Sequence, residues 1–541
     1  MWEGALAAAG GLVLAALMTF PLALHVGREI GKDLGDPLLQ AWQVAWIGHA
    51  LLHEPQELWQ ANTFWPYDDT LAFSDALVGY APAGLVAQAS PQAALVVYNL
   101  LFLGAYALAF TGAYLLGREL GLRVPGAAVA GAAFAYAPWK LTQNGHLHVL
   151  SSGGVPLALF LLVRGYRRES PWLVLAGWAV ASWQLTLGFT LGLQLAYLLA
   201  VLAAIAAFVL IRRPALRPAR AAVAATAIGL VLFAAAGLFM ARPYFRVVDA
   251  HPEARKTVET VVSFSPARRS FLAAPEQSWL WGDAATRARA PLAAPEEESL
   301  FPGMTIGLLA LVGLFASVYP LRLRIGLGVG VAVCALFSLG LRNVEGPGRY
   351  LTPYQFLYDF APGWDGVRTP GRINMLTSLG LALLAGAGLC ALVGRLRGRW
   401  ALGAAGVALA AVLLEGLGPL GHPRVPPPPQ VMRVAQAPQL HLPAGYHDDL
   451  VYSYWSTAGF PAMVNGAGGF DPSGYDRLRR ELAGFPDRRS VATLRRLGVH
   501  SVLVHPERVQ GTGWEDAVQR PVAGLPLDRE VVDGVILYRL R

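Results

Sequence analysis

Residues 94–123 read ALVVYNLLFLGAYALAFTGAYLLGRELGLR, an uncharged apolar run that ends in a short basic segment. A helix needs about 20 apolar residues to cross the hydrocarbon core of a bilayer, so residues 94–117 are predicted to span a membrane. Only 14% of the 541 residues are charged and 55% are hydrophobic, whereas soluble proteins carry roughly 25% charged residues. This composition excludes a water-soluble enzyme of this size and predicts an integral membrane protein.

Ten further runs share this apolar character, which predicts about eleven spans. They are residues 4–26, 124–139, 149–163, 172–189, 191–211, 220–240, 303–320, 325–341, 373–394 and 400–419. Short arginine-rich loops join them on one side, at 118–123, 164–169, 212–220, 322–324 and 394–399. Because short basic loops stay in the cytoplasm, we expect a multi-pass protein of the plasma (inner) membrane with a cytoplasmic N-terminus. The same rule accounts for the net charge of +8 without a nucleic-acid partner.

The predicted fold is an α-helical polytopic membrane domain (1–424) followed by a small extracytoplasmic α/β domain (430–541). The proline-rich stretch VPPPP (425–429) is predicted to be a stiff linker between them. The long external loops of the membrane domain are expected at 27–93, 241–302 and 342–372. The soluble domain is expected to contain a helix at 491–499 and strands at 500–506 and 533–541.

The first external loop begins with KDLGDP (32–37), which places Asp33 and Asp36 just past the first span. A carboxylate in this position can serve as a general base toward a hydroxyl group. The alternative is structural, with Asp36 as the N-cap of a helix and Pro37 as its first residue, and one residue can do both. The apolar residues and tryptophans of 37–52 recur at helical spacing, which predicts a helix lying in the membrane interface.

A second acidic pair, Asp68 and Asp69, lies in the stretch YDDT (67–70), which has the composition of a surface turn. Paired carboxylates can also hold a hard divalent cation. A Mg²⁺ or Mn²⁺ site is therefore the alternative interpretation of this pair.

The stretch KLTQNGHLHVLSSGG (140–154) follows a predicted span on the external side. Gln143, His146 and His148 are polar groups at the mouth of the predicted bundle, where a substrate could be held. The histidines are two positions apart, so a helix would place them on different faces, which argues against a metal pair. A histidine hydrogen-bonded between spans is the alternative.

Basic residues also occur on the external side, against the general rule. Arg255 and Lys256 lie in the loop 241–302, and Arg368 and Arg372 flank the entry to the span that begins near residue 373. Arginine matches phosphate oxygens with two parallel hydrogen bonds. These residues are predicted to bind an anionic lipid phosphate, and the alternative is that each is an ordinary solvated loop residue.

Together these features resemble the GT-C superfamily of membrane glycosyltransferases, which use polyprenyl-phosphate-linked sugars. The nearer likeness is to bacterial multipass proteins of the YfhO-like type. The motifs that carry it are GDPLLQAW (35–42), GHLHVLSSGGVPLAL (145–159), SLFPG (299–303), PGWDGVRTPGRI (362–373), VNGAGGFDPSGYDRL (464–478) and LRRLGVHSVLVHP (494–506). The resemblance implies that Asp36 is the catalytic base, with Asp33 as second candidate. Gln143 and His146 stand where the family usually has a second acidic site, so the usual metal arrangement is not implied here.

The function implied by the resemblance is transfer of a hexosyl or pentosyl group from a polyprenyl-phosphate carrier. The acceptor would be a glycan, lipid or protein outside the cytoplasm, with membrane lipids as further partners. Two other classes stay open at this point, a flippase or transporter of lipid-linked sugars and a non-catalytic envelope scaffold.

The predicted topology can be tested with single cysteines in a chain that lacks Cys334 and Cys390. Cysteines placed in the loops 164–169 and 394–399 should be shielded from an impermeant thiol reagent in intact cells, because both loops are predicted to be cytoplasmic. Cysteines beside Asp283 and Gly468 should be labelled. Labelling of the arginine-rich loops from outside would overturn the topology.

Overall fold

The computed structural model describes residues 2–341 and 352–541, so residues 342–351 of the predicted loop 342–372 lie outside the described part. The chain divides into two compact units. Unit 1 comprises residues 1–24, 101–240 and 256–420, and unit 2 comprises residues 25–100, 241–255 and 421–541. Unit 2 therefore combines the predicted soluble domain with the whole of the predicted external loop 27–93, and the bounds of that domain stay a prediction.

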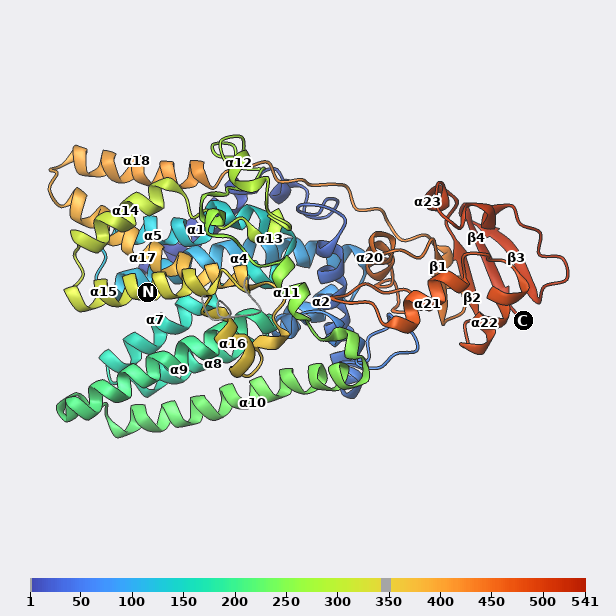
Figure 1. Cartoon of the computed structure of the whole chain (residues 1–541), viewed down its shortest axis with the longest axis horizontal. Coiled ribbons are helices and arrows are strands. Elements are labelled where there is room, and N and C mark those ends of the chain that lie inside the picture. The colour runs from blue at the N-terminus through green and yellow to red at the C-terminus, as the bar shows by residue number, and fades with distance from the viewer. Residues whose placement is uncertain (1, 342–351) are drawn as a thin grey trace. The chain divides into compact units, whose positions relative to one another are not determined.

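Within residues 2–341 and 352–541, five helical segments are long and apolar enough to cross a membrane by length and composition (Figure 1). They are α4 (Pro91–Leu120), α6–α7 (Leu147–Leu150 and Gly154–Arg167), α9 (Phe189–Arg212), α10 (Arg220–Ala250) and η11–α17 (Pro370–Ile373 and Asn374–Val393). The other predicted spans coincide with shorter helices. These are α1 (Trp2–Met18), α5 (Val124–Tyr136), α8 (Pro171–Leu185), α14 (Met304–Phe315), α15 (Leu321–Phe337) and α18 (Arg399–Glu415). The helical membrane class agrees with the sequence, while the count of eleven spans stays a prediction.

Helix α17 packs closely against α14 and α5 through glycines. A Cβ atom on Gly313 of α14 would lie 1.9 Å from a backbone oxygen of α17, and one on Gly388 of α17 would lie 2.1 Å from a backbone oxygen of α14. Gly126 of α5 and Gly386 of α17 face each other in the same way. A Cβ atom on Gly126 would lie 2.5 Å from the Gly386 carbonyl oxygen, and one on Gly386 would lie 2.4 Å from the Gly126 carbonyl oxygen. Small residues permit such backbone contact between membrane helices. These contacts hold the C-terminal half of α17 against α14 and α5.

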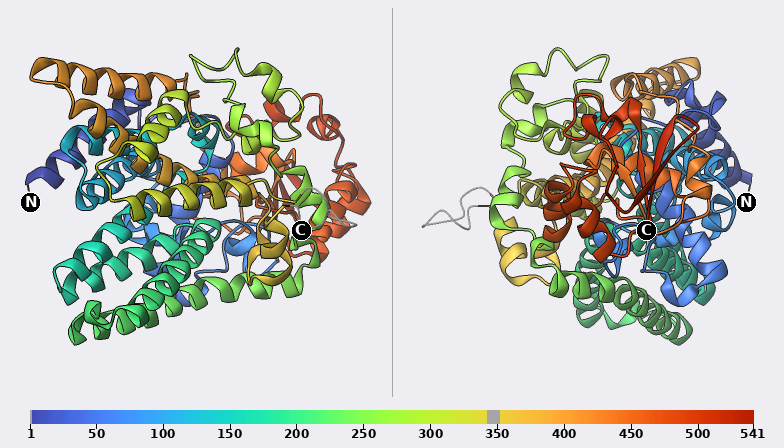
Figure 2. Two further views of the ribbon diagram at one scale, coloured as in Figure 1. Left: turned by 60° about the vertical axis from the view of Figure 1, so that its left-hand side comes forward. Right: turned by 90° about the vertical axis from the view of Figure 1, so that its right-hand side faces the viewer.

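The helices α9 and α10 have largely uncovered apolar surfaces. In the most apolar stretch of each helix only 17% of the residues are buried. Phe208 and Val231 are 59% and 68% exposed. Figure 2 shows α7, α8 and α9 alongside one another, and glycines at Gly165 and Gly177 bring α7 and α8 together. Apolar surface of this extent is compatible with lipid rather than water.

Unit 2 contains a four-stranded sheet in the order β1-β2-β4-β3 (Figure 1). Its strands are β1 (Gln439–Leu442), β2 (Ser501–Val504), β3 (Leu527–Val532) and β4 (Val535–Leu540). β1 and β2 are parallel, whereas β4 is antiparallel to both β2 and β3. The predicted helix and strands near the C-terminus are confirmed, as α22 (Arg488–Arg496), β2 and β4. A fully buried Val-Leu-Val run in β2 explains why this strand could be read from the sequence.

Helix α2 (Asp36–His53) is buried over most of its length, so the prediction that it lies in the membrane interface is wrong. Residues 37–48 and 50 are buried, and the helix packs against α3 (Ala81–Ala87) and α20 (Tyr446–Trp455). The indole of Trp42 donates to Asn62 Oδ1 at 2.9 Å, and that of Trp46 donates to the Leu58 carbonyl at 2.9 Å. Tryptophans suit a membrane interface and a hydrogen-bonded protein interior equally well, so periodicity alone could not separate the two.

The motif VNGAGGFDPSGYDRL (464–478) builds a buried polar network in unit 2. Asn465 accepts from the His441 amide at 2.6 Å and donates to the His441 carbonyl and to Asp449 at 2.9 and 2.8 Å. The Asp449 carboxylate also accepts from the Tyr475 hydroxyl at 2.7 Å and from Arg479 at 2.9 Å. A network in which each member is paired stabilises a unique arrangement. We therefore assign this motif a structural role.

Substitution Asn465→Ala should destabilise unit 2 by about 2–4 kcal/mol, because it leaves a buried carboxylate and the His441 backbone short of partners. The melting temperature of the full chain in detergent measures this loss. Gln510→Ala removes an exposed amide from the same unit and should leave melting unchanged. Equal melting of the two variants would contradict the assigned role.

Candidate active site

A buried ion pair joins two segments of unit 1 that are far apart in the chain. Glu297 lies in α13 (Pro295–Glu298), and Arg372 lies in η11, at the start of the segment that continues as α17. Arg372 donates through Nη2 to Glu297 Oε1 at 2.6 Å and through Nε to Oε2 at 3.2 Å. Their side chains are 8% and 9% exposed. The geometry is a two-pronged guanidinium–carboxylate pair, the strongest form of such contact.

Three of the predicted binding residues converge on this pair. Arg372 Nη1 lies 3.0 Å from His148 Nε2, and because a guanidinium can only donate, this nitrogen of His148 accepts. His146 Nδ1 lies 3.1 Å from Gln143 Oε1 and 3.9 Å from Glu297 Oε1. The two histidine rings are 5.6 Å apart. They meet because His146 precedes α6 in a non-helical conformation, so the prediction that a helix separates them does not apply.

The electrostatics of the pair keep Glu297 ionised. Burial alone would raise the pKa of its carboxyl group, but the positive charge of Arg372, with contributions from His146 and Arg368, holds that pKa well below the usual value. The Glu297 carboxylate therefore neutralises Arg372. This charge compensation is what allows a guanidinium to be buried at this position.

Lys140 is a second buried cation in the same part of unit 1. It lies in η5 (Pro138–Gly145), and its Nζ donates to Ser152 Oγ at 3.1 Å and sits 4.5 Å from the centre of the Phe134 ring. Burial lowers the pKa of this ammonium group to about 7. Burial thus disfavours the charged form of Lys140, an environment that the sequence pattern did not indicate.

The other predicted phosphate-binding residues do not form part of the ion pair. Arg368 precedes Arg372 by four positions, whereas Arg255 and Lys256 are far from both partners in the chain. Arg368 is partly exposed and its guanidinium lies 4.9 Å from the centre of the Phe264 ring. Arg255 is exposed at the end of η7 (Pro252–Ala254), and the Lys256 carbonyl accepts from the Tyr358 hydroxyl at 3.2 Å. Of these residues, Arg368 combines a partly exposed guanidinium with an electrostatic link to Glu297.

The predicted base, Asp36, belongs to unit 2 and is the first residue of α2. Gly35 occupies the N-cap position, so the prediction that Asp36 is the N-cap is wrong by one residue. The half-buried Asp36 carboxylate accepts from the Tyr446 hydroxyl at 3.2 Å. Asp33 Oδ1 accepts from the Gly35 amide at 2.8 Å, and its other oxygen lies 3.8 Å from Lys32 Nζ. Asp33 therefore orders the turn before α2.

The acidic pair at 68–69 does not fit a metal site. Asp69 is buried and adopts a left-handed backbone conformation (φ 54°). Its carboxylate accepts from Arg246 Nε at 2.7 Å and from the adjacent Nη2, while Asp68 is exposed. Across residues 2–341 and 352–541, no group of three or more His, Cys, Asp or Glu side chains is arranged to hold a metal ion. The surface-turn prediction is wrong for Asp69, because its ion pair with Arg246 draws it inside.

Glu297 is the member of the cluster to which the sequence analysis gave no role. Its only signal is the acidic triplet EEE (296–298) directly before the motif SLFPG. Glu296 is exposed, and Glu298 accepts from the Ala294 amide at 2.7 Å in the first turn of α13. Three identical neighbours thus have three different environments, which residue type alone cannot distinguish.

Comparison with solved structures identifies the fold. The whole of this chain matches 40% of the arabinofuranosyltransferase AftD from mycobacteria, with a TM-score of 0.58 and 15% sequence identity. The chain has a GT-C fold. A mutant form of AftD matches 99% of this chain over 41% of its own length, with a TM-score of 0.56 and 16% identity. At these identities the GT-C likeness concerns the fold alone, and the chain spans about two fifths of the length of AftD.

Comparison with a more distant solved structure adds nothing to the fold assignment. The archaeal oligosaccharyltransferase AglB from Archaeoglobus fulgidus, solved with an inhibitory peptide and dolichol-phosphate, has a TM-score of 0.44 and 14% identity. It covers 92% of this chain and 69% of its own, a likeness too slight for inference. No protein-family model and no curated protein matches by sequence, so the closeness to YfhO-like proteins stays a prediction.

Removal of the Glu297 charge should destabilise unit 1. Glu297→Gln leaves the buried guanidinium of Arg372 without its counter-charge, which typically costs about 3–5 kcal/mol. The melting temperature of the full chain in detergent should fall, while Glu296→Gln, at an exposed neighbouring carboxylate, should change it little. Because the pKa of Glu297 is lowered in the folded chain, its contribution is complete at neutral pH and is lost only as the pH falls through that lowered value. Unchanged melting of Glu297→Gln would show that the pair is dispensable.

Proposed function

We propose that the protein is an integral membrane glycosyltransferase that moves a hexosyl or pentosyl group from a polyprenyl-phosphate carrier to an extracytoplasmic glycan, lipid or protein. The observation that supports this most is the GT-C fold, which extends over the whole chain and so includes both compact units. The structural neighbour AftD is itself an arabinofuranosyltransferase, which favours a pentosyl donor.

In the proposed reaction the bond between the sugar C1 and the phosphate oxygen breaks, and a bond from C1 to the acceptor oxygen forms. The acceptor hydroxyl loses its proton to Asp36, and the carrier phosphate departs with the negative charge. A carboxylate offers about four acceptor positions, and the Tyr446 hydroxyl occupies one at Asp36. This bond orients the carboxylate at the first residue of α2.

The charge that develops on the carrier phosphate requires a positively charged group to stabilise it. We assign this role to Arg368, because its guanidinium is partly exposed and is held over the Phe264 ring. Arg372 is already neutralised by Glu297, and its proposed contribution is to hold the segment that carries Arg368. Gln143, His146 and His148 are proposed to bind sugar hydroxyls, since their side chains join the same hydrogen-bonded cluster.

The proposed base is tested by Asp36→Asn with a radiolabelled polyprenyl-phosphate sugar and purified full chain. Asparagine keeps the shape of aspartate but cannot take up the proton, so the transfer rate should fall about a hundredfold or more. Asp33→Asn is the matched control, because Asp33 hydrogen-bonds the turn, and it should lose far less. Melting temperature and donor binding should stay near wild type in both variants. Full transfer by Asp36→Asn would remove Asp36 as the base.

The role of Arg368 is tested separately with Arg368→Gln. We expect weaker donor binding and slower transfer while melting is retained, because the side chain is partly exposed. Donor binding and turnover at wild-type levels would remove Arg368 from the proposed site without affecting the assignment of Asp36.

A further inference from the structure

Unit 2 contains a cavity of about 340 Å³ that belongs to none of the residues assigned above. The end of α2 forms one wall through His49 and His53. Ser90, immediately before α4, and the segment 457–460 form the floor and a second wall. Arg433, in α19 (Val431–Val434), completes the lining. All of these segments lie within unit 2.

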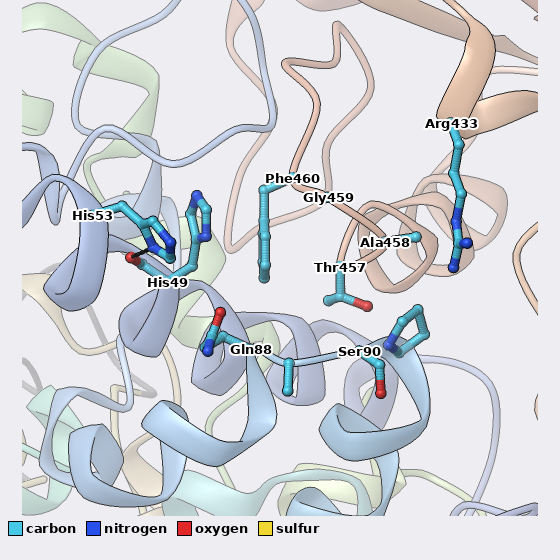
Figure 3. Close-up of a pocket in the computed structure, with 11 residues that line it drawn as sticks. His49, His53, Gln88, Ser90, Arg433, Thr457, Ala458, Gly459 and Phe460 are labelled. Atoms are coloured by element: carbon cyan, nitrogen blue, oxygen red, sulfur yellow. Dashed lines mark hydrogen bonds between the residues drawn. The ribbon is translucent and has the colours of Figure 1, made fainter.

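Three aromatic rings, two from α2 and one from the segment 457–460, stack at the cavity. The His49 ring lies 4.6 Å from that of His53 and 4.2 Å from that of Phe460, with interplanar angles of 28° and 19°. Figure 3 shows these rings side by side, with Arg433 on the other side of the cavity and extending toward Ala458. The stack orders two imidazoles at the cavity wall. His53 Nδ1 lies 2.9 Å from the His49 carbonyl, so Nδ1 donates and Nε2 is the nitrogen left for a ligand. Nε2 donates to a phosphate oxygen when the ring is protonated and accepts from a protonated phosphate when the ring is neutral.

The lining carries positive and hydrogen-bonding groups and no described acidic residue. Arg433 is exposed and has no ion-pair partner within residues 2–341 and 352–541. The Ser90 hydroxyl accepts from the Ala93 amide at 3.1 Å, which leaves its own proton available to a ligand. An arginine, two imidazoles and a hydroxyl around one cavity are the donor set that suits phosphate oxygens.

Exposed apolar residues stand next to lining residues in the chain, at the ends of α2 and α3. Leu51 and Leu52 precede His53 at the end of α2 and are 37% and 54% exposed. Leu85 and Val86 lie in α3, just before the lining residue Gln88, and are 43% and 61% exposed. A polar cavity bordered by exposed leucine and valine side chains matches a ligand with a polar head and an apolar chain.

We propose that this cavity binds the phosphate group of a membrane lipid, with Arg433 and His53 as the principal phosphate ligands and the apolar residues of α2 and α3 against the lipid chain. The site is distinct from the residues assigned to sugar transfer, and the proposal holds whether or not the chain is a glycosyltransferase. Lipid held there would anchor unit 2 to the membrane surface beside the start of α4, whose first residue, Pro91, also lines the cavity.

Native mass spectrometry of the full chain in detergent tests this proposal, with phosphatidic acid, phosphatidylcholine and inorganic phosphate as probes. The wild-type chain should retain phosphatidic acid in preference to phosphatidylcholine. Arg433→Gln should weaken this binding about tenfold, the value of one charge-assisted hydrogen bond, and His53→Gln should weaken it less. Arg480→Gln removes an exposed arginine of unit 2 that does not line the cavity and should bind as wild type.

The outcomes are distinguishable from failure of the proposed glycosyl transfer, because none of them measures turnover. Weak competition by inorganic phosphate supports a phosphate site that also uses the lipid chain. Inorganic phosphate that binds as tightly as phosphatidic acid would overturn the lipid assignment in favour of a soluble phosphate ligand. Unchanged phosphatidic acid binding in folded Arg433→Gln and His53→Gln, or an equal loss in Arg480→Gln, would overturn the site itself.

Discussion

The ion pair between Arg372 and Glu297 is the constraint on which the packing of α13, η11 and α6 in unit 1 depends. A buried guanidinium is costly unless a carboxylate matches its charge and geometry, so α13 and η11 must meet although 75 residues separate the partners. A Cβ atom on Gly371 would lie 2.7 Å from the Glu297 carbonyl oxygen, which shows how closely the two backbones approach. His148 joins the pair through Arg372. The start of α17, the end of the loop before α14 and the α6 segment are consequently fixed together.

Polar residues in this protein fall into two groups with different physical roles. In unit 2, Asn465 and Asp449 are completely buried and bonded to neighbouring backbone and side chains, so they maintain the fold. Arg368, Asp36 and Arg433 are partly or fully exposed and can reach a ligand. Chemical reactivity is therefore assigned to exposed groups that buried networks position, a division of labour that fold alone would not indicate.

Two features of the structure suit contact with lipid, the apolar surfaces of α9 and α10 and the cavity proposed to bind a lipid phosphate. The apolar surfaces of α9 and α10 present uncharged side chains over long stretches, as contact with acyl chains requires. The cavity lined by His49, His53 and Arg433 instead offers hydrogen-bond donors beside a few exposed apolar residues. The first surface accounts for membrane residence, and the second accounts for recognition of a headgroup. Their separation follows from chemistry, because a hydrocarbon surface cannot satisfy the donors of an arginine.

The sequence by itself determined the membrane class, the positions of the long helices and the strands β2 and β4, because hydrophobic length and local alternation are properties of consecutive residues. It also led to the GT-C resemblance that the fold comparison supports. It could not show that α2 is buried, that Asp69 pairs with Arg246, or that Glu297 rather than its neighbours receives Arg372. Those facts depend on partners tens to hundreds of residues away, and only the tertiary structure brings such groups within hydrogen-bonding distance. The same holds for the cavity lined by His49, His53 and Arg433, because its lining comes from segments that are far apart in the chain and share no local pattern.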